Sequence, residues 1–130
     1  MDMKLELVPI PVADVDRAKA FYVDTLGFVA DVDARPAEGV RVVQVTPPGS
    51  ACSIGFGSGL ASYDATREPV RDLHLVVPDI EKAREELVGR GVDVGEVQDL
   101  GGGVRYVFFA DPDGNTFALQ EMAWRTGENF

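Results

Sequence analysis

The sequence predicts an α+β fold of two βαβββ modules in one chain, each with a sheet that its helix covers on one face. Three observations predict it. The two halves of the 130-residue chain repeat one order of elements at an offset of 64 to 65 residues. Apolar residues recur at alternate positions in the expected strands and at helical spacing in the expected helices. A single βαβββ unit leaves one face of its sheet bare, so two units must combine to bury enough apolar area.

The first module spans about residues 1–57. Its helix is expected over residues 14–26, because Asp14 can accept hydrogen bonds from the free N–H groups of a first helical turn. Gly27 can adopt the left-handed conformation that ends a helix. The expected strands of this module are residues 5–12, 28–34, 40–46 and 51–57.

The second module spans about residues 71–124 and follows the same plan. Its helix is expected over residues 79–90, between the cap Asp79 and Gly91. Residues 58–70 between the modules have the composition of a linker. The expected strands of this module are residues 71–77, 92–98, 104–110 and 115–122, the last two separated by the turn ADPDG.

Composition limits the partners and the compartment. The 22 acidic and 12 basic residues give a net charge of -10, which repels polyphosphate and argues against a nucleic-acid partner. A neutral or cationic ligand is easier to accommodate, although the charge also serves solubility. No apolar stretch reaches the roughly 18 residues of a membrane span, and the N-terminus lacks the order of a signal peptide. With Cys52 as the single cysteine, these features predict a soluble cytoplasmic protein without a membrane partner.

Candidate ligand-binding residues follow from strand alternation. Branched apolar residues are expected to face the helices, so their neighbours along each strand point to the opposite, open face of the sheet. A ligand would bind on that open face. The candidates are Leu7, Gln44 and Ser53 in the first module and Asp72, His74, Tyr106, Phe108 and Ala118 in the second.

Asp72 and His74 are the candidate catalytic residues. They lie two positions apart on one predicted face, where their side chains can converge on one ligand. Histidine titrates near neutral pH, so His74 is open to general acid or base catalysis, to ligand binding, or to a plain polar role in the wall. Tyr106 and Phe108 either form an aromatic wall for a flat ligand or belong to the core. Arg41 and Arg105, which the repeat pairs, are expected to be ordinary solvated charges.

The paired modules, the helix motif VADVDRAKAFYVDTLGF and the turn and strand FFADPDGNTFALQE resemble the vicinal oxygen chelate superfamily. This group is also called the glyoxalase/bleomycin-resistance/dioxygenase superfamily, and the chain resembles a glyoxalase-like branch of unassigned activity. The resemblance covers nearly the whole chain and implies one domain over residues 1–130. It also implies that the strands form a curled mixed sheet, or cup, with the helices on the outside. Because this cup is often completed across a dimer in the superfamily, the resemblance implies a homodimer.

The resemblance further implies where a divalent metal would be bound. Enzymes of the superfamily commonly use His or Glu seven residues before the helix-capping aspartate and Glu three residues past the Asn of DPDGN. These rules lead to Leu7 and Asp72 and to Ala118. The first-module counterpart of Ala118 is Ser53, or Ile54 if the turns align one residue later. A catalytic divalent ion needs about three protein ligands, and only Asp72 is a good one. We therefore expect no metal and no cofactor.

Three functions remain open. The favoured one is a metal-free cup that binds a small organic molecule, cationic or aromatic, for sequestration or resistance. The alternative is a lyase, isomerase or dioxygenase that works without the usual metal or with a displaced one held by Asp72 and His74. The third is a scaffold protein that has lost the site. Whether the protein is an enzyme stays open, because function depends on the site rather than on the fold.

Overall fold

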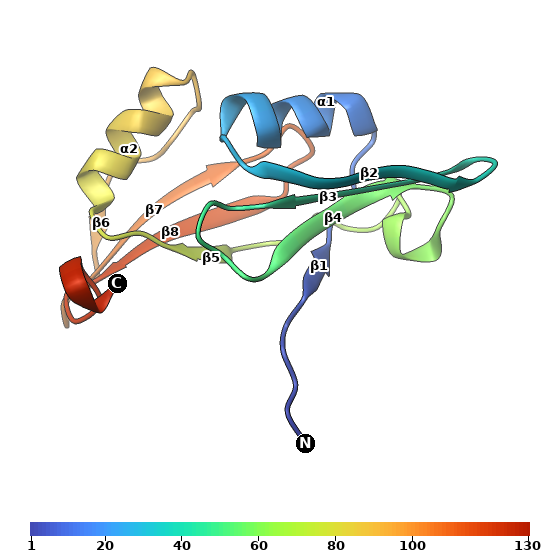
Figure 1. Cartoon of the computed structure of the whole chain (residues 1–130). Coiled ribbons are helices and arrows are strands. Elements are labelled where there is room, and N and C mark those ends of the chain that lie inside the picture. The colour runs from blue at the N-terminus through green and yellow to red at the C-terminus, as the bar shows by residue number, and fades with distance from the viewer. The chain divides into compact units, whose positions relative to one another are not determined.

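Each half of the chain folds into a βαβββ unit, which confirms the predicted α+β fold class (Figure 1). The computed structural model describes residues 1–130 in two units, Met1–Pro69 and Val70–Phe130. Each unit contains one four-stranded mixed sheet. No helix is both long enough and apolar enough to cross a membrane. That the two modules make a single domain stays a prediction.

The sheet of the first unit has the strand order β1-β4-β3-β2. Strand β1 is parallel to β4, and the other neighbours are antiparallel. The elements are β1 (Leu7–Pro9), the α-helix α1 (Val15–Lys19), the π-helix η1 (Ala20–Thr25), β2 (Val29–Ala37), β3 (Val40–Thr46), β4 (Ser53–Ser58) and the 3-10 helix η2 (Ala61–Tyr63).

The sheet of the second unit repeats this plan in the order β5-β8-β7-β6, with β5 parallel to β8. The remaining neighbours are antiparallel. The elements are β5 (Leu73–Val76), α2 (Ile80–Gly89), β6 (Gln98–Asp99), β7 (Val104–Ala110), β8 (Thr116–Met122) and the 3-10 helix η3 (Gly127–Asn129).

Both helices begin at the aspartates that the sequence indicates. The Asp14 carboxylate accepts a hydrogen bond of 3.1 Å from the Arg17 N–H. The Asp79 carboxylate accepts one of the same length from the Lys82 N–H. Each cap satisfies an N–H group that has no partner inside its helix, so the predicted helix starts are confirmed.

One regular helix was expected over residues 14–26. The structure differs, because the second half of this helix is a π-helix. In this half the Leu26 N–H donates to the Phe21 carbonyl, five residues back, at 2.9 Å. Gly27 then ends the helix with a φ of 80°, and Gly91 follows α2 with a φ of 82°. Both glycines therefore take the left-handed conformation predicted for them.

Three strands are much shorter than expected. Strand β5 keeps only Leu73–Val76 of the expected 71–77. Strand β1 keeps three residues, because Pro9 and Pro11 have no N–H group to give to a ladder. Of the expected strand 92–98 only Gln98 pairs regularly, in the two-residue strand β6, apart from one isolated bridge between Val94 and Phe109. The order of the elements is unaffected.

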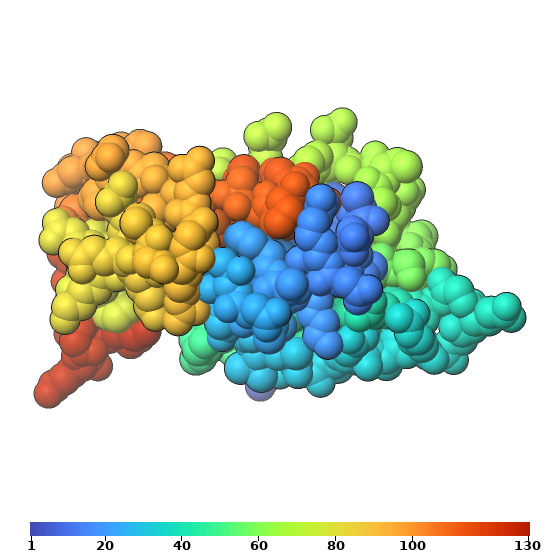
Figure 2. All heavy atoms as spheres, turned by 90° about the horizontal axis from the view of Figure 1, so that it is seen from above, coloured from blue at the N-terminus to red at the C-terminus, as the bar shows by residue number.

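Each helix covers one face of the sheet in its own unit. In the space-filling view, the residues of α1 (blue) and α2 (yellow) lie on the surface nearest the viewer (Figure 2). Beneath α1 the fully buried Tyr22 ring lies 5.7 Å from the rings of both Phe28 and Phe56. In the second unit Phe109 and Phe117 stack at 5.1 Å. The face opposite the helix is the open face of each sheet.

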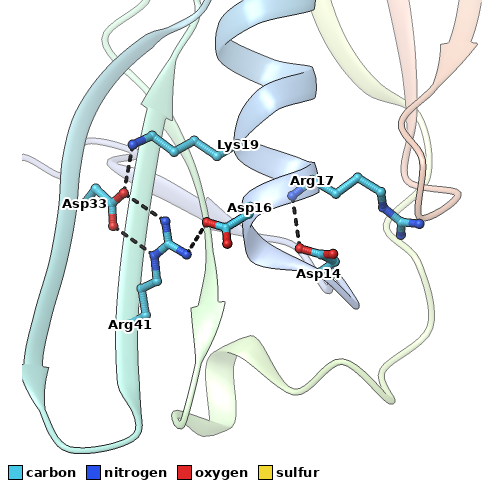
Figure 3. A network of polar contacts seen from close by, with 6 residues as sticks. All are labelled: Asp14, Asp16, Arg17, Lys19, Asp33 and Arg41. Carbon is cyan, nitrogen blue, oxygen red and sulfur yellow. Dashed lines mark hydrogen bonds and ion pairs between the residues drawn. The ribbon is translucent and has the colours of Figure 1, made fainter.

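An ion-pair cluster joins α1 to β2 and β3 (Figure 3). The Arg41 guanidinium donates two hydrogen bonds of 3.0 Å to Asp33 and one of 2.6 Å to Asp16. The Lys19 ammonium donates to Asp33 at 2.8 Å. Arg41 is only 9% exposed, so the expectation of a solvated charge is wrong. The reason is its position in β3, where alternation places it on the helix side beside buried valines.

The second unit contains a similar link. Arg105 of β7 donates to Glu121 of β8 at 2.8 and 2.5 Å, and to Glu81 of α2 at 3.2 Å. In both units an arginine on a strand therefore binds a carboxylate of the covering helix.

We expect Asp33→Asn to flatten the acid dependence of stability. Hydrogen bonds from Arg41 and then Lys19 hold the pKa of Asp33 well below its ordinary value of 3.8. Because the pKa of Asp33 is lower in the folded state than in the unfolded state, its carboxylate stabilises the fold at pH values above the unfolded-state pKa. This contribution is lost as the pH falls through the folded-state pKa. Urea unfolding between about pH 5 and pH 2 should therefore show a steeper loss for the wild type than for Asp33→Asn. Asp2→Asn, at an exposed aspartate, is the control, and equal slopes in all three proteins would contradict the expectation.

A buried turn holds β5 beside β8. Asn115 is fully buried, and its Oδ1 accepts a hydrogen bond of 2.9 Å from the Val70 N–H. Its Nδ2 and its backbone N–H both donate to the Asp111 carboxylate at 2.9 Å. The Thr116 N–H donates to the Val70 carbonyl at 2.9 Å. The turn ADPDGN thus binds the residues that precede β5.

We expect Asn115→Ala to lower the free energy of unfolding by about 3 kcal/mol, because a buried backbone N–H and a buried carboxylate oxygen lose their partner. Urea denaturation followed by circular dichroism measures this change. Asn129→Ala, at an exposed asparagine, should leave the midpoint unchanged. A loss below about 1 kcal/mol for Asn115→Ala would show that the amide does not hold the turn.

Candidate functional site

In the second unit the strand register gathers the candidate residues around Ala118. On the open face His74 of β5 pairs with Ala118 of β8 on one side, and Phe108 of β7 pairs with it on the other. Tyr106 of β7 pairs with Gln120 of β8. Ala118 is fully buried although it lies on the open face, so it forms a small floor between larger neighbours.

Three rings form what we call the aromatic patch, His74, Tyr106 and Phe108. The His74 and Tyr106 ring centroids are 5.6 Å apart and nearly perpendicular, at 84°. Tyr106 and Phe108 stack at 5.9 Å and 19°. The Gln120 Nε2 donates a hydrogen bond of 3.1 Å to the Tyr106 hydroxyl and so fixes the central ring. Gln120 is a residue that the candidate set lacked, although alternation also places it on this face.

The His74 ring has a defined tautomer. Its Nδ1 lies 2.7 Å from the Asp72 carbonyl oxygen. A carbonyl oxygen only accepts hydrogen bonds, so Nδ1 carries the proton in this contact. In the neutral imidazole the Nε2 atom is then an acceptor. His74 is exposed, so Nε2 is open to a ligand.

Asp72 does not follow the strand alternation from which its role was predicted. Its φ is 58°, in the left-handed region, and β5 begins only at Leu73. Its N–H donates to the Thr116 hydroxyl oxygen at 2.7 Å, and the Thr116 hydroxyl lies 3.4 Å from its Oδ1. Asp72 thus meets His74 through its carbonyl, while its carboxylate lies beside Thr116. A catalytic role of the carboxylate stays a prediction.

The first unit places its three candidates on neighbouring strands. Leu7 of β1 pairs with Ser53 of β4. The Ser53 hydroxyl lies 2.7 Å from the Thr46 hydroxyl of β3, which also bonds the Asp31 carboxylate. Gln44 lies on β3 two residues before Thr46. This face therefore carries hydroxyl and amide groups where the second unit carries rings.

Tyr63 of η2 lies against the open face of the first sheet, and the candidate set lacked it. A methyl group built on Gly55 would lie 2.9 Å from the Tyr63 hydroxyl oxygen, and one built on Gly57 would lie 3.1 Å from its Cδ2. The two glycines of β4 therefore make room for the ring. Glycines at alternate positions of a strand are the sequence signal for such a close approach. Tyr63 is 7% exposed, and burial raises the pKa of its phenol.

A cavity of about 460 Å³ lies beside this segment. Its lining includes Val12, Val15, Gly57, Leu60 and Tyr63. Gly57, which the ring edge approaches, lines the cavity, whereas Gly55, beside the hydroxyl, does not. The phenol oxygen thus lies on the sheet face at the far end of the ring from Gly57.

The residues at the metal positions of the family do not fit a divalent ion. Leu7 and Ala118 have no donor atom, and the Ser53 hydroxyl is engaged with Thr46. Asp72 alone offers a carboxylate. No group of three or more His, Cys, Asp or Glu side chains in residues 1–130 is arranged to hold a metal ion. We therefore derive no chemistry from a metal here.

The chain matches a known protein family over most of its length. The family model of the Glyoxalase/Bleomycin resistance protein/Dioxygenase superfamily matches residues 4–119. The chain belongs to this superfamily. The resemblance seen in the sequence is therefore confirmed. No curated protein sequence matches the chain significantly.

Solved structures from the superfamily match nearly the whole chain. TnmS3, an antibiotic binding protein from Streptomyces sp. CB03234, is 30% identical, with a TM-score of 0.78 over 93% of this chain and 97% of that one. A superfamily member from Sphaerobacter thermophilus DSM 20745 is 35% identical, with a TM-score of 0.78 over 92% and 98%. A glyoxalase/bleomycin resistance protein from Streptomyces sp. CB03234 is 32% identical, with a TM-score of 0.73 over 89% and 98%.

We expect protein purified without added metal to contain no stoichiometric divalent ion, because the superfamily's metal positions offer one carboxylate only. Elemental analysis by mass spectrometry measures the metal content. Dialysis against EDTA should leave the melting temperature unchanged, since no bound ion stabilises the folded state. A tightly held ion that disappears in Asp72→Asn would contradict this expectation.

Proposed function

We propose that this superfamily member binds a small planar organic molecule on the open face of the second sheet and acts by sequestration or resistance. The observation that carries this function is the aromatic patch around the Ala118 floor. Stacked rings offer flat apolar area to a planar ligand. The small floor residue leaves space between Phe108 and His74, and Gln120 holds the Tyr106 ring in place.

Polar groups beside the patch supply orientation. The His74 Nε2 accepts a hydrogen bond in the neutral ring, because Nδ1 is bonded to the Asp72 carbonyl. A mostly apolar surface with a few placed polar groups is typical of small-molecule sites. The net charge of -10 favours a cationic ligand, since it raises the local concentration of cations.

The known relatives support the same function. TnmS3 is described as an antibiotic binding protein, and the superfamily includes bleomycin resistance proteins. We extend antibiotic binding to this chain on the basis of the aromatic patch. A homodimer in the cytoplasm is part of the proposal, because cups of this superfamily are often completed across a dimer and a single cysteine fits a reducing compartment.

An enzyme is the second candidate function. The observation that favours it is the exposed His74, whose fixed tautomer leaves Nε2 to accept a proton from a substrate. A lyase or isomerase would need this step. Two observations weigh against an enzyme. The Asp72 carboxylate lies beside Thr116 rather than His74, and the metal ligands of the family are missing.

Binding of doxorubicin and of bleomycin tests the proposed function. Doxorubicin is a planar aromatic antibiotic with an amine, so it matches the patch in shape and charge. We expect both to raise the melting temperature of the wild type. Phe108→Ala should weaken doxorubicin binding about tenfold in calorimetry, since a stacking surface is lost. Phe130→Ala, at an exposed C-terminal ring, should bind like the wild type.

Two results would overturn binding on the aromatic patch. One is the absence of binding by either antibiotic, which favours the scaffold. The other is equal doxorubicin affinity in the wild type and Phe108→Ala. Turnover of a methylglyoxal–glutathione adduct that is lost in His74→Ala would instead support the enzyme.

A further inference from the structure

We infer that Tyr63 is a ligand-contacting residue, whose phenol hydroxyl donates a hydrogen bond to a carbonyl or similar acceptor of a small molecule on the open face of the first sheet. This inference rests on the proposed function and deepens it, because it assigns a polar recognition group to the first unit. It also states what the ligand must carry, namely a hydrogen-bond acceptor.

The first argument is that the hydroxyl has no partner within the protein. Tyr63 is 7% exposed, and its only hydrogen bond is the backbone contact from its N–H to the Leu60 carbonyl at 3.0 Å. The hydroxyl oxygen is not one of the buried side-chain atoms that lack a partner, so it keeps contact with solvent although most of the ring is buried. It is therefore accessible to a ligand.

The second argument is the position of the hydroxyl. The ring follows β4 from Gly57 to Gly55, so that its oxygen stands over Gly55. A methyl group built on Gly55 would touch both this oxygen and the Leu7 side chain, at 2.9 and 3.0 Å, so the two groups are neighbours. Gln44 pairs with Gly55 from the other side. The hydroxyl thus stands over the glycine that lies between the candidate residues Leu7 and Gln44.

The third argument concerns the protonation of the phenol. Burial raises its pKa, so the group keeps its proton throughout the neutral range and acts as a donor. The two glycines of β4 allow the approach, and Ala61–Tyr63 form a helical turn that carries the ring. Residues 58–70, which have the composition of a linker, thus place a hydrogen-bond donor, the Tyr63 hydroxyl, against the sheet.

Calorimetry with doxorubicin, whose quinone carbonyls are acceptors, tests the inference in Tyr63→Phe. We expect affinity to fall about fivefold, the effect of one lost neutral hydrogen bond. The free energy of unfolding should not fall, because the removed hydroxyl has no partner in the protein. Ser62→Ala removes a hydroxyl from the same turn at an exposed position and should bind like the wild type.

A second variant displaces the phenol rather than removing its oxygen. Gly55→Ala places a methyl group 2.9 Å from the hydroxyl oxygen, so the ring must shift and affinity should fall as well. NMR of tyrosine labelled at Cζ gives an independent readout. The Tyr63 signal, identified by its loss in Tyr63→Phe, should move on addition of doxorubicin.

The outcomes separate this inference from the proposed function. Wild-type affinity in Tyr63→Phe together with lost affinity in Phe108→Ala would overturn the role of Tyr63 alone. Weakened binding in Tyr63→Phe with unchanged binding in Phe108→Ala would support Tyr63 and overturn the aromatic patch. No binding of doxorubicin by the wild type would overturn both.

Discussion

The buried amide of Asn115 is the contact on which the geometry of the second unit depends. Val70 precedes β5, and Asn115 begins the entry into β8, so the hydrogen bond between them sets these two strands side by side. Parallel neighbours cannot be joined by a tight turn, and here a side chain ties their starts together instead. The resulting register pairs His74 with Ala118. The placement of the aromatic rings is therefore a consequence of a turn that lies outside the aromatic patch.

Local patterns predicted most of the fold, and contacts between distant residues account for what they missed. Alternation and capping are properties of neighbouring residues, so the order of strands and the helix starts could be predicted. Arg41 was wrongly expected to be solvated, because its partner Asp16 is 25 residues away and no local signal pairs them. Tyr63 was missed because residues 58–70 have the composition of a linker, which gives no sign that one of their rings is buried. Asp72 lies just outside β5, because its backbone is left-handed where the expected strand would begin.

The two units keep one fold and differ in their open faces. On the helix side each has an aspartate cap and an arginine bound to a carboxylate of the helix, so this side is constrained by stability. On the open side the first unit has hydroxyl groups and a phenol, whereas the second has stacked rings. Such a division separates the residues that fold the protein from those that recognise a ligand.

The π-helix of the first unit has a consequence for how the two halves of the chain are related. Asp79 follows Asp14 by 65 residues, whereas Gly91 follows Gly27 by 64, so the first unit has one residue more between cap and end. An extra residue in an α-helix would turn every later side chain by about 100° and remove it from the core. The wider turn over Ala20–Thr25 absorbs that residue, and Tyr22 stays fully buried. The π-helical turn therefore accounts for the one-residue difference in length between the two helices.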